Sequence, residues 1–416
     1  MRRVVVTGVG VVSPCGLDAA STWENVVAGK SGIAPIAGFD ADGFATRFAG
    51  ECTGFNAEAY IEKRRLREGD RFIHLAVAAS AMAIEQAGVD AWSAAAKEKV
   101  GTFIGVGMCG LDLLERSARV LAERGPRKIT PYFIPSVIAN LAPGQVSMRH
   151  GLRGPSFTTT SACSSGAHAL GEALRWIQRG DIVAAVAGGA EAAVTGLGVG
   201  GFNAMRALSQ RNDAPEAASR PFDKDRDGFV IAEGAGILML EERDHAIARG
   251  AEIFAEFVGY GATADAYHLT QPAPEGEGAQ RAMRACLADA GVSIDQVDYV
   301  NAHATSTPTG DVQESIAIRS VFHGHPKGTP LVSSTKSMTG HLLGAAGGLE
   351  AVLSVLSVHH QIVPPTINVD NLDPACAGLQ LVTRDARRHP VKVAISNAFG
   401  FGGTNVTLAF CAHDRA

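Results

Sequence analysis

Two stretches rich in glycine and alanine resemble each other in this chain: CSSGAHALGEAL at residues 163–174 and HLLGAAGGLEAV at residues 341–352. An alignment without gaps pairs Gly166 with Gly344, Ala167 with Ala345 and Glu172 with Glu350. Each stretch has the pattern of a helix that follows the polar end of a strand. Three identities in so biased a composition arise readily by chance, yet the alignment places a cysteine and a histidine at equivalent helix starts.

Outward from these two stretches, short β-rich apolar runs alternate with segments of helical spacing, which is typical of layered α/β proteins. The runs predict strands at 2–9, 100–106, 181–189, 236–242, 253–261, 297–303, 391–399 and 406–411, and helices at 72–88, 111–125 and 279–290. The second series looks like a repetition of the first. We therefore expect two similar halves, residues 1–250 and 251–416, in one compact unit.

Composition excludes several classes of protein. A chain of 416 residues with 46% hydrophobic residues is long enough for a large core and too long for a single small binding module. The formal net charge of -5 provides no general basic field to bind nucleic acid or an anionic membrane. Seven scattered cysteines without a CxxC pair, no signal-peptide cleavage site and no uninterrupted apolar span predict a reduced, cytoplasmic protein.

Cys163 is the candidate nucleophile. In FTTTSACSSGAHAL, residues 157–170, it stands among small residues where a strand ends and a helix begins. The first amides of a helix and its dipole favour a thiolate at such a position. The alternative is a small buried hydrophobic residue, which is the usual role of a free cysteine.

Two histidines have matching surroundings: His303 in NAHATSTPTGD, residues 301–311, and His341 in SSTKSMTGHLLGAAGG, residues 333–348. Each follows an apolar run and is surrounded by hydroxyl groups and glycines. A thiolate served by imidazoles is the general arrangement of acyl-transfer catalysis.

A further loop and two charged residues complete the candidates. In ISNAFGFGGTNVTL, residues 395–408, three glycines surround Phe401, and such a loop lets backbone amides face a ligand as an oxyanion hole requires. Lys336 and Glu350 flank His341 and either polarise it or form a surface ion pair.

Two other motifs fail as ligand sites. Gly105, Gly107 and Gly110 spell GxGxxG, but no strand-borne acid follows about twenty residues later, as dinucleotide binding requires. The run 223–234 imitates a calcium loop, but its acid, Glu233, comes one position early, so we expect an ion-paired turn there. No zinc spacing occurs, and we predict no metal site.

Together, SACSSG, NAHATSTPTGD, SSTKSMTGHLLGAAGG and NAFGFGGTN closely resemble the β-ketoacyl-acyl carrier protein synthases, and specifically the type II condensing enzymes of fatty acid synthesis. The resemblance extends from VVVTGVGVVSP at the start to the final strand. It implies a thiolase-like fold of five αβαβα layers with two duplicated halves, usually a homodimer.

The resemblance also implies the chemistry. Cys163 takes an acyl chain from acyl carrier protein, and malonyl-acyl carrier protein then loses carbon dioxide and attacks that thioester. His303 and His341 stabilise the enolate, the amides of Cys163 and Phe401 form the oxyanion hole, and Phe401 acts as a gate. The product is a 3-oxoacyl chain two carbons longer.

Other roles come from the resemblance alone. The phosphopantetheine arm arrives on the carrier protein, so no bound cofactor is expected, although the family allows a structural monovalent cation near Glu350. The resemblance implies that the catalytic residues are Cys163, His303, His341, Lys336 and Phe401, supported by the polar residues Glu350, Asp311 and Glu314. The residues implied to bind substrate are Thr305, Thr307, Met108, Phe399, Asp265 and His268. The residues implied to dock the carrier protein are Arg64, Arg65, Arg67, Arg127, Lys128 and Arg206.

The sequence departs from the family at the acyl pocket, where Met108 replaces a frequent isoleucine and Cys109 a glycine, which leaves chain length open. Three alternatives remain. A ketosynthase of a polyketide or specialised lipid pathway uses the same chemistry. A thiolase or hydrolase is disfavoured because the loop around Phe401 lacks a second cysteine. A non-catalytic chain-length partner is disfavoured because Cys163 is present.

Overall fold

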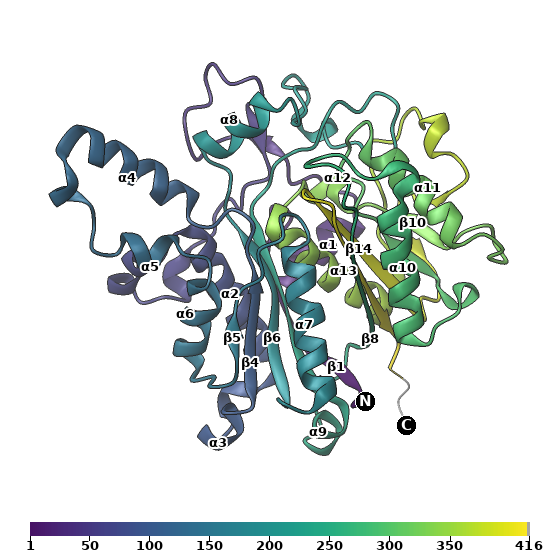
Figure 1. Cartoon of the computed structure of the whole chain (residues 1–416), viewed down its shortest axis with the longest axis horizontal. Helices are drawn as coiled ribbons and strands as arrows, with labels where there is room; N and C mark the ends of the chain where they lie inside the picture. The colour runs from purple at the N-terminus through teal and green to yellow at the C-terminus, as the bar shows by residue number, and fades with distance from the viewer. Residues whose placement is uncertain (414–416) are drawn as a thin grey trace.

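The computed structural model describes residues 1–413, and within that range eleven strands form one mixed sheet (Figure 1). Their order across the sheet is β12 (Gln380–Leu381), β10 (Leu331–Ser333), β9 (Tyr299–Asn301), β14 (Val393–Gly400), β15 (Thr404–Cys411), β8 (Ala255–Ala264), β1 (Val4–Val12), β7 (Gly234–Glu242), β6 (Ala184–Glu191), β4 (Val100–Gly105) and β5 (Ser156–Phe157). All the strands expected from the apolar runs are present, with ends that differ by a few residues.

The strand order repeats on either side of the join between β1 and β8. From the join outward, one half runs β1, β7, β6, β4, β5 and the other runs β8, β15, β14, β9, β10. In each half the first two pairings are antiparallel and the next two are parallel. The join itself is a short antiparallel pairing of Val5 with Glu256 and Val6 with Ala255, and Arg3 forms an ion pair with Glu256 beside it.

Helices cover both halves and also separate them, which gives the five layers. On the outer faces, α2 (Arg71–Ala87) packs on β1 and β7, and α10 (Glu277–Ala290) packs on β8 and β15. Between the halves lie α7 (Ser165–Arg179), which contacts β6 and β4, and α13 (Ala346–His360), which contacts both β7 and β14. This is the thiolase-like arrangement that the resemblance implied.

The two central helices, α7 and α13, contain most of the glycine- and alanine-rich stretches at residues 163–174 and 341–352. A Cβ atom on Gly347 would lie 2.8 Å from the Cβ of Ala167, and one on Gly166 would lie 2.9 Å from the amide nitrogen of Gly348. No side chain fits at this crossing, because real Cβ atoms keep larger distances. Every residue of α13 up to Val358 is buried, so its apolar composition reflects its place between the two halves of the sheet.

The remaining elements surround this core. The helices are α1 (Ala19–Val27), α3 (Ala94–Lys97), α4 (Leu111–Arg124), α5 (Phe133–Val137), α6 (Leu141–His150), α8 (Gly196–Ala204), α9 (Arg243–Ala248), α11 (Gly310–Val321) and α12 (Lys336–Thr339), and the short strand pairs are β2 (Ala34–Pro35) with β3 (Phe48–Ala49) and β11 (Ile362–Val363) with β13 (Arg387–Arg388). Helix α4 projects from the body of the molecule (Figure 1). Within residues 1–413, the helices are too short or too polar to span a membrane.

The two rejected motifs have structural roles. Gly105 ends β4 against the start of α7, where a Cβ would lie 2.2 Å from the carbonyl carbon of Ser165. Asp223 forms a buried ion pair with Arg220 at 2.9 Å and accepts the amide of Asn371 at 2.8 Å, so the calcium-like run is the ion-paired turn that we expected.

Candidate active site

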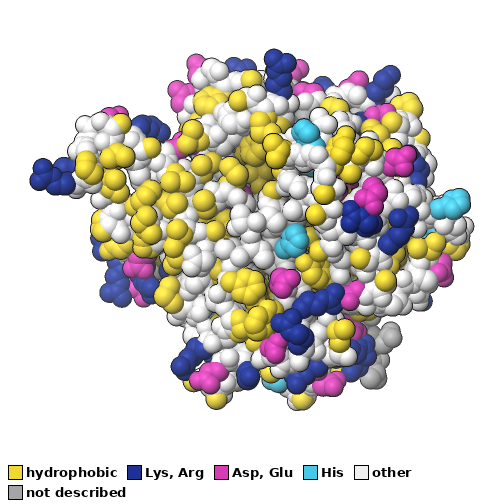
Figure 2. All heavy atoms as spheres, viewed as in Figure 1, with side chains coloured by type: hydrophobic (Ala, Val, Ile, Leu, Met, Phe, Trp, Pro, Cys, Tyr) yellow, Lys and Arg dark blue, Asp and Glu magenta, His cyan; other side chains and the backbone are white. Residues whose placement is uncertain are grey.

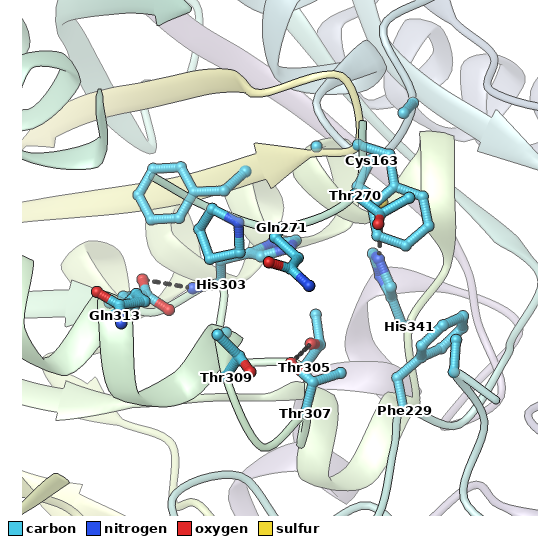
Figure 3. Close-up of a pocket in the computed structure, with 18 of the residues that line it drawn as sticks. Cys163, Phe229, Thr270, Gln271, His303, Thr305, Thr307, Thr309, Gln313 and His341 are labelled. Atoms are coloured by element: carbon cyan, nitrogen blue, oxygen red, sulfur yellow. Dashed lines mark hydrogen bonds between the residues drawn. The ribbon is translucent and has the colours of Figure 1, made fainter. Parts of the chain in front are cut away.

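A cavity of about 500 Å³ opens where the two halves meet (Figure 3). Residues from both halves line it, among them Cys163 and Phe229 from the first and His303, His341 and Phe401 from the second. In Figure 3 the labelled side chains of Cys163, His303 and His341 converge on the same space. The site is therefore composite and depends on the packing of one half against the other.

The cysteine sits on a strained and well-anchored turn. Cys163 lies two residues before α7 and is 8% exposed, and the preceding Ala162 has φ +50°, which is unfavourable for a side chain larger than glycine. The hydroxyl of Ser164 donates to the carbonyl of Ala398 at 2.9 Å, and the hydroxyl of Ser165 donates to the carbonyl of Ala162 at 2.6 Å. These bonds hold the strained turn and tie it to the second half.

His341 is in direct contact with the thiol. Its Nε2 lies 3.0 Å from Sγ of Cys163, and its backbone amide donates to the carbonyl of Val230 at 2.7 Å. The ring of His303 stands nearly perpendicular to that of His341, with centroids 5.3 Å apart, and Phe229 packs edge-on against His341 with centroids 5.4 Å apart. The sequence prediction that the cysteine and the two histidines meet is confirmed as geometry.

Burial dominates the electrostatics of these groups. It raises the pKa of the Cys163 thiol to about 11, although Lys336 and the amides of Phe401 and Cys163 act in the opposite direction. The amides near the helix start thus favour the thiolate, as expected, but burial outweighs them. Burial and the charge of Lys336 also hold the pKa of both His303 and His341 well below the usual range, so both imidazoles are neutral at neutral pH.

Lys336 and Glu350 form an ion pair deep in the protein. Their side chains are 1% and 3% exposed, so the surface ion pair considered from the sequence is wrong. Burial raises the pKa of Glu350 to about 7 against the stabilising charge of Lys336. The carbonyl of Lys336 accepts a hydrogen bond from Ser219 at 2.7 Å, which fixes the start of α12.

Two buried carboxyl groups hold the loop that carries His303. Glu314 accepts the backbone amides of His303 at 2.9 Å and Ala304 at 2.6 Å, together with the side-chain amide of Asn397 at 3.0 Å. Asp311 accepts the amide of Phe222 at 2.9 Å. Burial raises the pKa of Glu314 to about 7 and of Asp311 to about 6. Both residues support the loop, and Asp311 does not line the cavity.

Five of the six predicted substrate-binding residues line the cavity, all except His268. The hydroxyl oxygens of Thr305 and Thr307 are 3.2 Å apart, and the ring of Phe399 lies with its centroid 5.8 Å from that of His303. Asp265 also lines the cavity and accepts the side-chain amide of Asn405 at 2.7 Å.

His268 lies elsewhere than the sequence predicted. It is exposed and does not line the cavity. Its Nδ1 accepts the backbone amides of Thr270 and Gln271, both at 3.1 Å, and these two residues do line the cavity. His268 thus shapes a loop at the site and does not contact the cavity itself.

Met108 and Cys109 occupy the start of the segment between β4 and α4. Met108 lines the cavity and is 36% exposed. Cys109 has φ +53°, a conformation that glycine adopts without strain, which fits the glycine that the resemblance implied at this position.

The six predicted docking residues are spread over three segments. Arg206 lines the cavity, whereas the others are on the segments 63–68 and 126–128. Arg67 lies over the ring of Tyr132 at 4.9 Å, close to α5. Arg64 and Arg65 form ion pairs with Glu62 and Glu68, so part of their charge is already compensated.

Sequence reasoning missed two residues at the site. Phe229 packs on His341 but stands in an ordinary apolar run, which gives no signal. Glu191 is fully buried at the end of β6, and burial raises its pKa to about 7. An acid in the otherwise apolar stretch AAVAGGAE was the signal that could have found it.

Comparisons with known proteins agree with this geometry. Residues 1–246 match the family described as beta-ketoacyl synthase, N-terminal domain, and residues 254–370 match its C-terminal domain. A 3-oxoacyl-[acyl-carrier-protein] synthase 2 of Vibrio cholerae is 50% identical over 98% of this chain and 99% of its own length. A beta-ketoacyl synthase from Burkholderia phymatum STM815 has a TM-score of 0.92 at 36% identity, covering 99% of this chain and 100% of that one. A ketosynthase solved with its type II polyketide acyl-carrier protein has a TM-score of 0.90 at 33% identity, covering 99% and 100%.

Proposed function

Because the chain belongs to the beta-ketoacyl synthase family, we propose that it is a 3-oxoacyl-[acyl-carrier-protein] synthase, an acyltransferase that elongates fatty acyl chains by decarboxylative condensation with malonyl-acyl carrier protein. One observation carries the proposal. The thiol of Cys163 and the imidazoles of His341 and His303 meet at one cavity, with Nε2 of His341 3.0 Å from the sulfur.

In the first step, the sulfur of Cys163 attacks the thioester carbonyl of the acyl-carrier substrate. A new C–S bond forms, the C–S bond to the phosphopantetheine arm breaks, and the proton of Cys163 goes to the departing thiolate. Because the resting thiol is protonated, His341 first accepts the proton of the thiol and then passes it to the departing thiolate. The backbone amides of Phe401 and Cys163 hydrogen-bond to the sulfur, which supports their role as donors to the carbonyl oxygen as it becomes negative.

In the second step, the C–C bond between the malonyl carboxylate and its α-carbon breaks and releases carbon dioxide. The electron pair passes onto the thioester oxygen as an enolate, next to N–H groups of His303 and His341. Neutral imidazoles suit this role because they donate hydrogen bonds where charge develops. The α-carbon then attacks the acyl group on Cys163, and the thiolate leaves and regains a proton.

Acyl carrier protein is the partner that this chemistry requires. We propose that Thr305 and Thr307 contact its phosphopantetheine arm, since their hydroxyls line the cavity. The acidic carrier would dock on the arginines and lysine at 64–67, 127–128 and 206, of which Arg206 lies at the cavity. The solved ketosynthase with a bound acyl-carrier protein supports this kind of partner.

A structural cation fits near Glu350. Among the described residues, Oε2 of Glu350 and Oδ1 of Asn301 are buried oxygen atoms without a hydrogen-bond partner. Oxygen ligands suit a monovalent cation, and we propose that the free oxygen of Glu350 is one of them. The described residues contain no cluster of histidine, cysteine, aspartate and glutamate that could hold a metal.

We also propose a homodimer. Figure 2 shows hydrophobic side chains gathered on the side where α5 and α6 lie in Figure 1. Ile134 on α5, Met148 on α6 and Ile138 just after α5 are between 40% and 62% exposed. The neighbouring β5 is an edge strand with one free side. A second copy of the chain would cover this face. Sedimentation of the purified protein tests this directly, and a monomer at micromolar concentration would contradict it.

A polyketide ketosynthase is the second candidate. A solved ketosynthase of a type II polyketide system superposes closely, but at 33% identity, whereas the 3-oxoacyl-[acyl-carrier-protein] synthase 2 relatives reach 50%. Turnover with a series of straight-chain acyl-carrier substrates separates the two. Extension of at least one straight chain is expected, and failure to extend any of them would exclude the elongation role.

We also propose that the protein is located in the cytoplasm, as expected from its cysteines.

A further inference from the structure

Glu191 is a buried acid that the acyl-transfer chemistry above does not use. It is the last residue of β6 and is 0% exposed. No ion pair to it exists among the described residues. Instead its Oε2 accepts three backbone amides: Gly107 at 2.9 Å, Met108 at 3.1 Å and Gly344 at 3.1 Å.

These three amides belong to two separate walls of the cavity. Gly107 and Met108 line it from the segment between β4 and α4. Gly344 follows His341 by three residues, next to Leu343, which also lines the cavity. One carboxylate therefore joins the segment at the acyl pocket to the turn that follows a catalytic histidine.

The packing leaves room for the carboxylate and nothing more. A Cβ on Gly107 would lie 2.6 Å from Oε2 of Glu191, and a Cβ on Gly344 would lie 2.2 Å from the amide nitrogen of Gly107. The middle glycine of the GxGxxG motif is thus explained by contact with an acid of the chain itself.

We propose that Glu191 is a positioning residue that fixes the wall of the acyl pocket, by holding the segment of Met108 against the turn after His341. The side chain of Met108 faces the cavity while its amide is held by Glu191. A loosened segment would let that wall move, so chain-length selection would weaken. The inference rests on the proposed acyl transfer at Cys163.

The negative charge of Glu191 also acts on the thiol. It raises the pKa of Cys163, and of Cys109 beside Met108, whereas Lys336 lowers the pKa of Cys163. His341 is the other titratable group in contact with the sulfur, and it is neutral. Removing the charge of Glu191 therefore favours the thiolate.

The test compares Glu191→Gln with a matched control, Glu241→Gln. Glutamine keeps the shape of the side chain and one acceptor oxygen but lacks the charge. Glu241 is a buried acid on the adjacent strand β7, where it pairs with Ala184 at the far end of β6 from Glu191 and binds Arg249 at 2.6 Å. Each variant is measured in two ways: the pH midpoint of alkylation of Cys163 by iodoacetamide, and the rates of acylation by a series of acyl-carrier substrates.

We expect Glu191→Gln to shift the alkylation midpoint to lower pH. We also expect it to slow acylation by the preferred chain roughly tenfold to a hundredfold, with a smaller loss for other chains. Glu241→Gln should change neither the midpoint nor the chain-length profile. If Glu191→Gln matches the control in either measurement, the inference is wrong.

Alkylation needs no acyl substrate, so it can be measured even if the proposed function is wrong. If the proposed function is wrong, the wild type itself takes up no acyl group. If only the inference is wrong, the wild type is acylated and Glu191→Gln behaves like the control. If Glu191→Gln does not fold, the inference is tested instead by amide hydrogen exchange in the wild-type protein. The amides of Gly107, Met108 and Gly344 should exchange far more slowly than unprotected amides. Exchange of any of the three at the unprotected rate would overturn the inference.

Discussion

At the scale of single residues, the first prediction concerns the separate roles of Cys163, which carries the acyl group, and of the two imidazoles, which stabilise the enolate. Replacing His303 by alanine should leave acylation of Cys163 nearly intact, whereas replacing His341 should slow acylation but leave it measurable, because His341 only relays the proton of the thiol. Decarboxylation should fall by about 10²- to 10³-fold, because a donor to the enolate oxygen is lost. Release of labelled carbon dioxide from malonyl-acyl carrier protein and acyl transfer are measured side by side.

Cys163→Ala is the control for that experiment, because it removes the acceptor of the acyl chain and should abolish acylation. Equal loss of acylation and decarboxylation in both histidine variants would contradict the division of roles. His359→Ala offers a further comparison, since His359 is on α13 and packs on Phe254 away from the cavity.

The second residue-scale prediction concerns pH. Because burial raises the pKa of Cys163 to about 11, the thiol is almost entirely protonated at pH 7. The thiolate is the reactive form, so alkylation by iodoacetamide should accelerate as pH rises and should reach half its maximum well above pH 9. A midpoint below pH 8 would show that the site stabilises the thiolate and that the burial argument fails.

At this scale the sequence predicted most of the site but not its electrostatics. The motifs around Cys163, His303 and His341 were recognisable because hydroxyl groups and glycines crowd them. The depth of burial depends on how the two halves pack, so neither the raised pKa of Cys163 nor the burial of Lys336 with Glu350 could be read from the chain. His268 is the one predicted substrate-binding residue that does not line the cavity, and it instead accepts the backbone amide of Thr270, which does.

At the scale of elements, the crossing of α7 and α13 makes a prediction about stability. Gly347→Ala places a methyl group 2.8 Å from Ala167, and neither helix can move without disturbing a sheet. We expect a loss of about 1 to 3 kcal/mol in the free energy of unfolding, by analogy with overpacked cores. Urea unfolding followed by circular dichroism measures it.

Gly201→Ala is the matched control, because Gly201 is in α8 and a Cβ there would meet nothing within 4 Å. It should leave stability unchanged or raise it slightly, since alanine favours helix more than glycine. If the two variants are equally stable, the close crossing is not what requires glycine at position 347.

Elements were the most predictable level of this fold. Helix α2 follows from its 3.6-residue periodicity, from Asp70, which caps its first turn, and from Gly88, whose φ of +69° ends it. The short strands β5, β10 and β12 were not predicted, because two or three residues carry too little periodicity to be seen. They depend on pairing with neighbours that are distant in the sequence.

At the scale of the whole molecule, surface charge makes the last of these predictions. The chain has a net charge of -5, so docking of an acidic carrier requires a local basic surface. Arg127→Glu should weaken carrier binding, and more so at low salt than at high salt, because ions screen exposed charges. Titration of acyl carrier protein at two salt concentrations checks this.

Arg388→Glu serves as the control, since Arg388 is exposed on β13 and outside the docking segments. Equal weakening by both variants would mean that total charge matters and position does not. Carrier affinity in Arg127→Glu that does not depend on salt would remove Arg127 from the docking surface.

The central claim is that the two halves of the molecule assemble one site that forms both the thioester and the new carbon–carbon bond. Mass spectrometry of the intact protein and of its peptides tests this claim most directly. The wild type is incubated with an acyl-acyl carrier protein and then chased with malonyl-acyl carrier protein. We predict one acyl group on the peptide that contains Cys163, followed by its loss as a 3-oxoacyl product two carbons longer. No adduct, an adduct on another residue, or release of the acyl group as a free acid would contradict the account.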